Sequence, residues 1–255
     1  MKDTSSKKIL ISGGKGNLAR MLNHFATPQY IVDNPSRDLM DITNLDEVVR
    51  RVEDFKPDYF IHSAAYTRPM RKHQDNPGIS IETNIIGTAN VALACMRYGV
   101  KMIYISTDYV YPGTEGDYKE TDPVSPYLGN NDGITKYGWS KLGGEAAVRI
   151  YDNSLILRLC MSNKPFPHKK AAVDIRKSYI FEDEAAKNIL KLIDCCGIIN
   201  VGGNAQTVYE FASKEDPDIQ KMKASDIKDV KIAPNTTMNI SKMKNILREV
   251  EKNEQ

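Results

Sequence analysis

Short apolar runs alternate with segments of helical spacing along the first 160 residues of the chain. Runs rich in β-branched and other apolar residues predict buried strands at 8–12, 29–33, 59–63, 101–106 and 154–159. Helical spacing predicts helices at 17–25, 45–55, 79–98 and 137–151, each between two of these strands. Strands that alternate with helices of about 10 to 15 residues form parallel sheets with helices on both faces. The expected fold class is therefore α/β, with a doubly wound parallel sheet.

The regular alternation of predicted strands and helices becomes less clear after residue 160. A predicted loop at 163–170 precedes a predicted helix at 182–195 and a strand at 198–201, and a polar, lysine-rich stretch ends in a further helix. We expect residues 1–160 to form the sheet domain. Residues 161–255 are expected to form a small C-terminal lobe laid against it, with an interleaved return to the sheet.

Composition and charge exclude several classes of protein. Hydrophobic residues make up 41% and charged residues 27% of the chain, which is typical of a globular protein and not of a disordered one. The net charge of +2 does not favour nucleic-acid binding. The first apolar run breaks at Gly13, too early for a signal peptide or a membrane span, so we expect a cytoplasmic protein without membrane contact. The cysteines and histidines lack the spacing of metal ligands, and no metal is expected.

A glycine-rich turn follows the first predicted strand and opens the first helix. It reads Gly13-Gly-Lys-Gly16-Asn17-Leu18-Ala19. Glycines let the backbone approach a pyrophosphate, and the helix N-terminus offers unpaired N–H groups to the anion. In this β-α-β context the turn predicts a Rossmann dinucleotide site that includes Gly13, Gly16, Asn17 and Leu18, although a plain tight turn has the same composition.

The end of the second strand bears on the choice of cofactor. Asp33 stands where a carboxylate usually binds the ribose hydroxyls of NAD, but Arg37 follows closely and suits a 2′-phosphate. Arginine forms bidentate, charge-assisted hydrogen bonds to phosphate, so the sequence favours NADP, with NADPH preferred over NADH. A solvated loop arginine remains the alternative.

Tyr137 and Lys141 are four residues apart, which places a phenol and an ammonium on the same face of a helix. A free tyrosine has a pKa of about 10, and a nearby cation favours the phenolate, so Lys141 is expected to adapt Tyr137 for proton transfer. Thr107 stands at the end of the strand 101–106, the edge where open α/β sheets bind ligands. Each feature alone occurs by chance in many proteins.

The three sites belong to a longer ordered set of residues. In chain order these are Gly13-x-x-Gly16-x-x-Ala19, Arg37-Asp-Leu-Met-Asp41-Ile-Thr, Lys56-Pro-Asp58, His62-Ser-Ala-Ala-Tyr-Thr67, Asn84-x-x-Gly87, Ser106-Thr-Asp-Tyr-Val-Tyr111 and Tyr137-x-x-x-Lys141 with Glu145. Over at least residues 8–159 the chain resembles the extended short-chain dehydrogenase/reductase superfamily, and within it the dTDP-4-dehydrorhamnose reductases.

The resemblance implies a dinucleotide-binding domain, a substrate-binding lobe and a role for each matching residue. Thr107, Tyr137 and Lys141 would be catalytic: Thr107 orients the keto oxygen, Tyr137 donates the proton, and Lys141 holds the nicotinamide ribose. The cofactor would also contact Asp41, Ile42, Ser63, Ala64, Ala65 and Tyr66, and the substrate would contact Thr67, Asp108 and Tyr109. Arg68 is a candidate contact to the substrate diphosphate because of its charge, and a solvated charged loop is the alternative. Asn84 would support the active-site helix.

The implied activity is NAD(P)H-dependent reduction of a nucleoside-diphosphate-linked 4-keto-6-deoxy sugar. Asp108-Tyr109 stands where the related dehydratases carry Asp-Glu, which favours the reductase branch. Two alternatives remain: a non-catalytic NADP-binding regulatory subunit, and another nucleotide-sugar epimerase or reductase. Superfamily members often pair through two long helices, so a homodimer is expected.

Two departures from the family pattern concern the substrate. The usual Pro-x-x-x-Tyr corresponds to Pro123 and Tyr127, yet only Tyr137 has a lysine four residues later. The intervening residues 128–136 are expected to loop out beside the active site. The chain also has Arg158-Leu-Cys-Met161 in place of an aromatic-rich run, and its C-terminal lobe is short.

Overall fold

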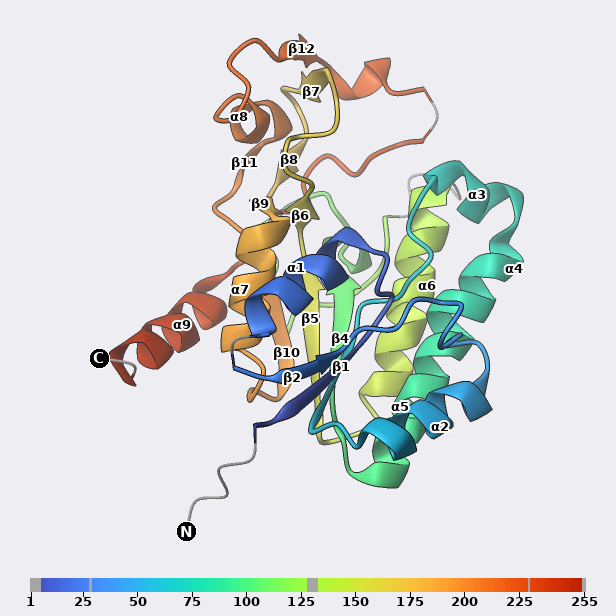
Figure 1. Ribbon diagram of the computed structural model, residues 1–255. Coiled ribbons are helices and arrows are strands. Elements are labelled where there is room, and N and C mark those ends of the chain that lie inside the picture. The colour runs from blue at the N-terminus through green and yellow to red at the C-terminus, as the bar shows by residue number, and fades with distance from the viewer. Residues whose placement is uncertain (1–5, 28, 128–132, 229, 254–255) are drawn as a thin grey trace.

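The computed structural model describes residues 6–27, 29–127, 133–228 and 230–253. Within these residues a central sheet of six parallel strands has the order β10-β5-β4-β3-β1-β2 (Figure 1). The strands are β1 (Lys8–Ser12), β2 (Ile31–Asp33), β3 (Tyr59–His62), β4 (Lys101–Thr107), β5 (Ser154–Leu159) and β10 (Gly197–Val201). The prediction of a doubly wound α/β sheet is confirmed.

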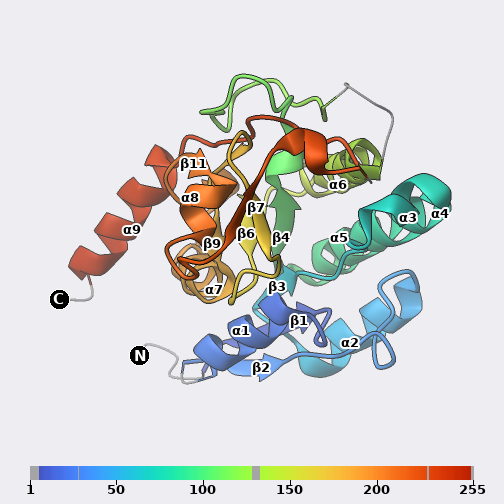
Figure 2. The same cartoon turned by 90° about the horizontal axis from the view of Figure 1, so that it is seen from above.

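Helices cover both faces of the sheet. One face carries α1 (Asn17–Ala26), α7 (Glu182–Lys191) and α9 (Ser241–Asn253), and the other carries α2 (Leu45–Phe55), α5 (Gly87–Tyr98) and α6 (Gly133–Val148) (Figures 1 and 2). Successive strand residues point to opposite faces. Ile9 and Ile11 therefore join the core under α1 and α7, whereas Leu10 joins the core under α2 and α5. The alternation explains why the strands read as continuous apolar runs.

The lobe lies above the carboxyl ends of the sheet strands (Figure 1). It contains three two-stranded pairs: β6 (Met161–Ser162) with β9 (Ile180–Phe181), β7 (Lys170–Ala172) with β12 (Gln220–Met222), and β8 (Arg176–Lys177) with β11 (Gln206–Thr207). It also contains α8 (Val208–Ala212) and the 3₁₀ turn η3 (Ala224–Asp226). Between these segments the chain returns to the sheet through α7 and β10.

Several element boundaries differ from the prediction. Two short helices, α3 (Met70–Asp75) and α4 (Pro77–Ser80), precede the predicted long helix, which contains a π-helical segment, η1 (Ile81–Ile86). The strand predicted from residue 29 begins at Ile31, because the N–H groups of Gln29 and Tyr30 bond to the last turn of α1. The helix predicted over 182–195 ends at Lys191.

The expected loop at 128–136 is only partly within the described residues. Residues 133–136 form the first turn of α6 and do not loop out, so that part of the prediction is wrong. The hydroxyl of Thr135 donates to the carbonyl of Tyr127 at 2.6 Å, which ties the start of this helix to the chain before it. Residues 128–132 lie outside the described residues.

The helical stretch Pro77–Tyr98 is long and apolar enough, by length and composition, to span a membrane. Half of its apolar window is buried inside the protein, where α5 packs against α2 and α6. Core helices of soluble proteins meet the same criteria, so this stretch is weak support for membrane insertion.

Candidate active site

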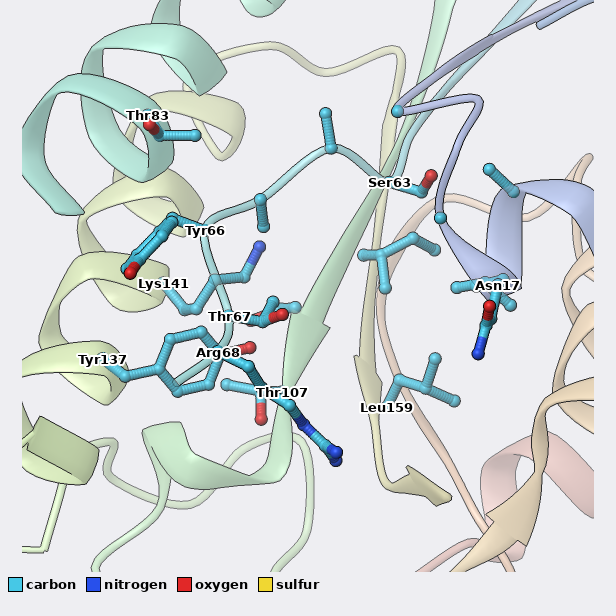
Figure 3. Close-up of a pocket in the computed structure, with 18 of the residues that line it drawn as sticks. Asn17, Ser63, Tyr66, Thr67, Arg68, Thr83, Thr107, Tyr137, Lys141 and Leu159 are labelled. Atoms are coloured by element: carbon cyan, nitrogen blue, oxygen red, sulfur yellow. The ribbon is translucent and has the colours of Figure 1, made fainter. Parts of the chain in front are cut away.

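A pocket of about 770 Å³ lies at the carboxyl ends of β1, β3, β4 and β5. In the sheet, β2 and β3 lie on opposite sides of β1, so the order of the strands changes direction at β1. The pocket lies at this point, the position at which doubly wound sheets bind ligands. Every residue predicted for the catalytic, cofactor and substrate sites lines this pocket, with the exception of Asp33. Figure 3 shows side chains from several elements, among them Asn17, Ser63, Thr107 and Tyr137, around this one space.

The glycine turn forms the floor of the pocket beside α1. Gly13 has φ +81°, and a Cβ there would lie 3.0 Å from the Cα of Ala64. A Cβ on Gly16 would lie 3.1 Å from the carbonyl oxygen of Gly13. Gly16 is also the N-cap of α1 and supplies no capping side chain, so the first N–H groups of this helix face the pocket. This cradle fits the pyrophosphate of a dinucleotide.

Asp33 does not have the predicted place in the site. Its carboxylate accepts two hydrogen bonds from Arg51 of α2, from Nε at 2.5 Å and from Nη2 at 2.6 Å. The ion pair holds β2 to α2 and occupies both oxygens that were expected to bind ribose. Asp33 does not line the pocket, and its contact with the cofactor ribose stays a prediction.

Arg37 and Asp41 lie together at the rim of the pocket. The Arg37 Nε donates to Asp41 at 2.9 Å, and the arginine side chain is 75% exposed. Burial opposes the charge of Asp41, but hydrogen bonds from Thr43 and Arg37 lower the pKa of its carboxyl. Ile42 is buried next to them. The group presents an exposed guanidinium at the rim of the pocket.

Thr107, Tyr137 and Lys141 converge on the opposite side of the pocket. Tyr137 and Lys141 come from α6, and Thr107 comes from the end of β4 (Figure 3). All three are buried. The Lys141 Nζ lies 4.2 Å from the ring centroid of Tyr104. Burial lowers the pKa of Lys141 to about 7, although the negative charge of Glu145 acts to raise it. The lysine therefore titrates near neutral pH.

The pKa of Tyr137 departs from the expectation. Burial and the charge of Asp108 raise it above the ordinary value, and a hydrogen bond from Thr107 and the charge of Arg68 oppose them less strongly. Desolvation disfavours the phenolate more than nearby cations favour it. Tyr137 is therefore a protonated phenol at neutral pH, the form that can donate a proton to a carbonyl oxygen.

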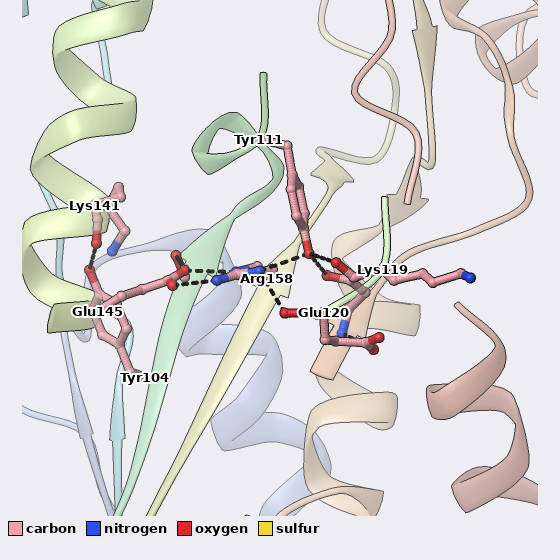
Figure 4. Close-up of polar contacts among 9 residues, drawn as sticks. Tyr104, Tyr111, Lys119, Glu120, Lys141, Glu145 and Arg158 are labelled. Atoms are coloured by element: carbon pink, nitrogen blue, oxygen red, sulfur yellow. Dashed lines mark hydrogen bonds and ion pairs between the residues drawn. The ribbon is translucent and has the colours of Figure 1, made fainter. Parts of the chain in front are cut away.

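A buried ion pair fixes α6 to the sheet (Figure 4). Glu145, one turn after Lys141, accepts from Arg158 Nη2 at 2.9 Å and from Ser106 Oγ at 2.6 Å. Arg158 also donates to the hydroxyl of Tyr111 at 2.9 Å. The side chains of Arg158 and Glu145 are 1% and 0% exposed. Because Ser106 directly precedes Thr107, the pair sets the position of α6 relative to the end of β4.

Asn84 joins the turn at residues 63–66, which follows β3, to the same helix. Its side chain accepts from the N–H of Tyr66 at 2.8 Å and donates to the carbonyl of Tyr66 at 2.9 Å. It also donates to Ser140 of α6 at 2.8 Å. The expectation that Asn84 supports the active-site helix agrees with these contacts. Asn84 lies in the π-helical segment, where the altered helical turn brings its amide to both partners.

Asp108 and Tyr109 follow Thr107 in the chain, and both were predicted to contact the substrate. Asp108 and Tyr109 both line the pocket, but the Asp108 carboxylate is paired with Lys177 of the lobe at 2.7 Å. Sequence reasoning did not select Lys177, because lysines of the lobe show no pattern that separates a buried one from solvated ones. Further lining residues that it did not select are Met70, Ile79, Glu82, Thr83, Leu159, Met161, Asn163 and Tyr179.

Comparisons with known proteins agree with this geometry. A family model described as RmlD substrate binding domain matches residues 7–162. The dTDP-4-dehydrorhamnose reductase of Aggregatibacter actinomycetemcomitans is 32% identical over 160 residues, which cover 59% of this chain and 50% of that protein. The methionine adenosyltransferase 2 subunit beta of Rattus norvegicus is 30% identical over 151 residues, which cover 56% of this chain and 43% of that protein. The chain spans about half the length of the curated relatives that it matches.

Among solved structures, the dTDP-4-dehydrorhamnose reductase of Bacillus anthracis in complex with NADP superposes with a TM-score of 0.84. The match covers 98% of both chains at 23% sequence identity. The likeness therefore extends beyond the region of the family model and includes the arrangement of the C-terminal lobe.

Proposed function

Because the chain belongs to the RmlD substrate binding domain family, we propose that it is an NADPH-dependent reductase of a nucleoside-diphosphate-linked 4-keto-6-deoxy sugar. The observation that carries this proposal is the meeting of Thr107, Tyr137 and Lys141 with the glycine turn in a single pocket. A relative named dTDP-4-dehydrorhamnose reductase, 32% identical in sequence, supports the substrate class.

Each catalytic residue has one task in the proposed reaction. Bound NADPH would supply the hydride that adds to C4 of the sugar. The hydroxyl of Thr107 donates a hydrogen bond to the keto oxygen, and the protonated phenol of Tyr137 transfers its proton to that oxygen as it gains charge. Lys141, buried beside Tyr104, would hold the ribose hydroxyls of the cofactor. One hydride and one proton convert the ketone to an alcohol, and the charge balances.

The experiment that tests the proposal is NADPH oxidation in the presence of dTDP-, UDP- and GDP-linked 4-keto-6-deoxy sugars, each with and without a 3,5-epimerase. Turnover with one nucleotide identifies the substrate. If added NADPH is not consumed but NADP is retained through purification and C4 epimers interconvert, the chain is an epimerase, and the reductase proposal is wrong.

A second candidate is a non-catalytic NADP-binding regulatory subunit. A relative named methionine adenosyltransferase 2 subunit beta, at 30% identity, favours it. Tight NADPH binding without turnover of any sugar nucleotide would support this candidate. The presence of all three catalytic side chains in the pocket is our reason for placing it second.

Arg37 is proposed to select NADPH over NADH. Its guanidinium is exposed at the pocket rim, where it can reach a 2′-phosphate. A hydrogen bond to a charged group contributes about 1.5 to 3 kcal/mol, so Arg37→Ala should raise the Kd for NADPH by roughly 10- to 100-fold. The Kd for NADH should change little. Fluorescence titration with both cofactors measures the effect.

Arg50→Ala is the matched control, because Arg50 is exposed on α2 and does not line the pocket. It should leave both dissociation constants unchanged. Equal weakening of NADPH and NADH by Arg37→Ala would contradict a role in binding the 2′-phosphate.

We also propose that the chain forms a homodimer through α5 and α6. Ile86 is exposed at the end of η1, Leu93 and Met96 are exposed on α5, and Trp139 and Ile150 are exposed on and just after α6. Such grouped apolar residues mark association surfaces. Light scattering at micromolar concentration should give the mass of a dimer, and Leu93→Glu should give a monomer. A monomeric unmodified chain at that concentration would rule the proposal out.

A further inference from the structure

Lys177 is a buried cation that the lobe contributes to the active site. It belongs to β8, lines the pocket, and has a side chain only 2% exposed. Its Nζ lies 2.7 Å from Oδ2 of Asp108 and 3.8 Å from the ring centroid of Tyr109. Lysine is almost never fully buried unless it is paired, so this placement requires the carboxylate.

Asp108 connects this lysine to the catalytic threonine. Its Oδ2 accepts hydrogen bonds from Lys177 and from the hydroxyl of Thr236, and its Oδ1 accepts one from the hydroxyl of Thr107 at 3.2 Å. A hydroxyl has a single proton to donate. Thr107 also interacts with the phenol of Tyr137, so Asp108, Tyr137 and the keto oxygen of the substrate would compete for this one proton.

We propose that Lys177 is a positioning residue for the reduction, acting through Asp108 on the hydroxyl of Thr107. The inference rests on the proposed function. Lys177 neutralises the carboxylate and, together with the hydroxyl of Thr236, occupies its Oδ2, which weakens the hydrogen bond of Oδ1 to Thr107. Asp108 then orients the hydroxyl of Thr107 through a weak hydrogen bond, and the hydroxyl can turn to the keto oxygen when substrate binds. Without the ammonium, Asp108 would be a charged acceptor that retains the proton of Thr107.

The charge of Lys177 depends on its partner and on the groups that face it. Burial opposes the ammonium, but Asp108 raises the pKa of Lys177 well above its ordinary value, so the lysine is charged at neutral pH. The other titratable groups that face the pair are Tyr109, Tyr137, Cys160 and Tyr179. Burial raises the pKa of each of them, so all four are neutral at neutral pH. Lys177 is therefore the charged group in direct contact with Asp108, while Arg68 and Lys141 also line the pocket beside Thr107.

Both partners of Asp108 Oδ2 come from segments beyond the sheet. Lys177 lies on β8, and Thr236 follows Asn235, which bridges to Arg176 of the same strand. The lobe thus completes the catalytic group at the end of β4 as well as covering the pocket. This gives the lobe a part in kcat and not only in substrate affinity.

The test compares kcat and KM of Lys177→Met in two backgrounds. In the unmodified chain the variant should lower kcat by about 10- to 100-fold with little change in KM, as expected when a catalytic hydrogen bond is lost. In a Thr107→Val background the same change should have almost no further effect, because no hydroxyl remains to be captured. A merely structural role would lower kcat by the same factor in both backgrounds, and that result would overturn the inference.

A second variant covers the case in which Lys177→Met does not fold, since it leaves a buried carboxylate unpaired. Asp108→Asn combined with Lys177→Met contains no buried charge, and its amide is a weaker acceptor for Thr107. The double variant should fold. If Lys177→Met is also obtained, the kcat of the double variant should be at least 10-fold above that of Lys177→Met. If Lys177→Met is not obtained, the kcat of the double variant should be within 10-fold of that of the unmodified chain. A lower kcat would overturn the inference. Lys170→Met, at an exposed lysine of the same lobe, should be unaffected.

The unmodified chain is assayed first, so the two proposals fail separately. If it reduces none of the sugar nucleotides, the proposed function is wrong and the role of Lys177 falls with it. If it turns over and Lys177→Met has an unchanged kcat, the proposed function stands and only the role of Lys177 is wrong.

Discussion

Tyr137→Phe should lower kcat for sugar-nucleotide reduction by about 10²- to 10⁴-fold, the usual contribution of a positioned general acid. The phenol is protonated at neutral pH because burial and Asp108 raise its pKa, and phenylalanine removes that proton while it keeps the ring. The ring packs edge-on against His73 at a centroid distance of 5.2 Å, so the pocket should keep its shape. NADPH affinity, measured by fluorescence titration, should therefore remain within a few-fold of that of the unmodified chain.

Tyr127→Phe is the matched control for this prediction. Tyr127 is the tyrosine that the family's proline spacing would select, but it does not line the pocket. The control should retain most of the activity. Loss of turnover in Tyr127→Phe together with full activity in Tyr137→Phe would show that the catalytic tyrosine has been misassigned.

Arg158→Met should lower the free energy of unfolding by about 3 to 5 kcal/mol, because it leaves the Glu145 carboxylate buried without its partner. The loss should be visible as an earlier midpoint in urea denaturation followed by circular dichroism. The double variant Arg158→Met with Glu145→Gln removes both charges and should recover most of the stability.

Arg149→Met gives the reference for an arginine at the surface, since Arg149 is exposed just after α6. Its effect should stay within about 0.5 kcal/mol. A double variant as unstable as the Arg158→Met single variant would mean that packing of the long side chain, and not the unpaired carboxylate, causes the loss.

The parts of the site that depend on local sequence could be predicted. The glycine turn, the Tyr137 and Lys141 spacing and the strand end at Thr107 are each contained in a few consecutive residues, and all of them line the pocket. Alternating strands and helices place these segments at the same edge of the sheet. The fold class followed from the same alternation.

The rest depends on pairs that are distant in sequence. Arg51 forms an ion pair with Asp33 across 18 residues of sequence, and Lys177 forms one with Asp108 across 69 residues. No periodicity marks such partners. The pKa of Tyr137 could not be predicted either, because its sign follows from how deeply the ring is buried and not from the lysine on the same helix face.

The way in which the lobe is connected bears on how such a protein can evolve. Its segments leave the sheet after β5 and after β10, and each time the chain comes back to a sheet helix. These segments are insertions in loops at the carboxyl edge, whereas the dinucleotide cradle is built by the loop after β1. Under the proposed function, substitution or exchange of the insertions would change which sugar is accepted while hydride delivery is retained. Lys177 limits that freedom, because any replacement for its segment must still neutralise Asp108.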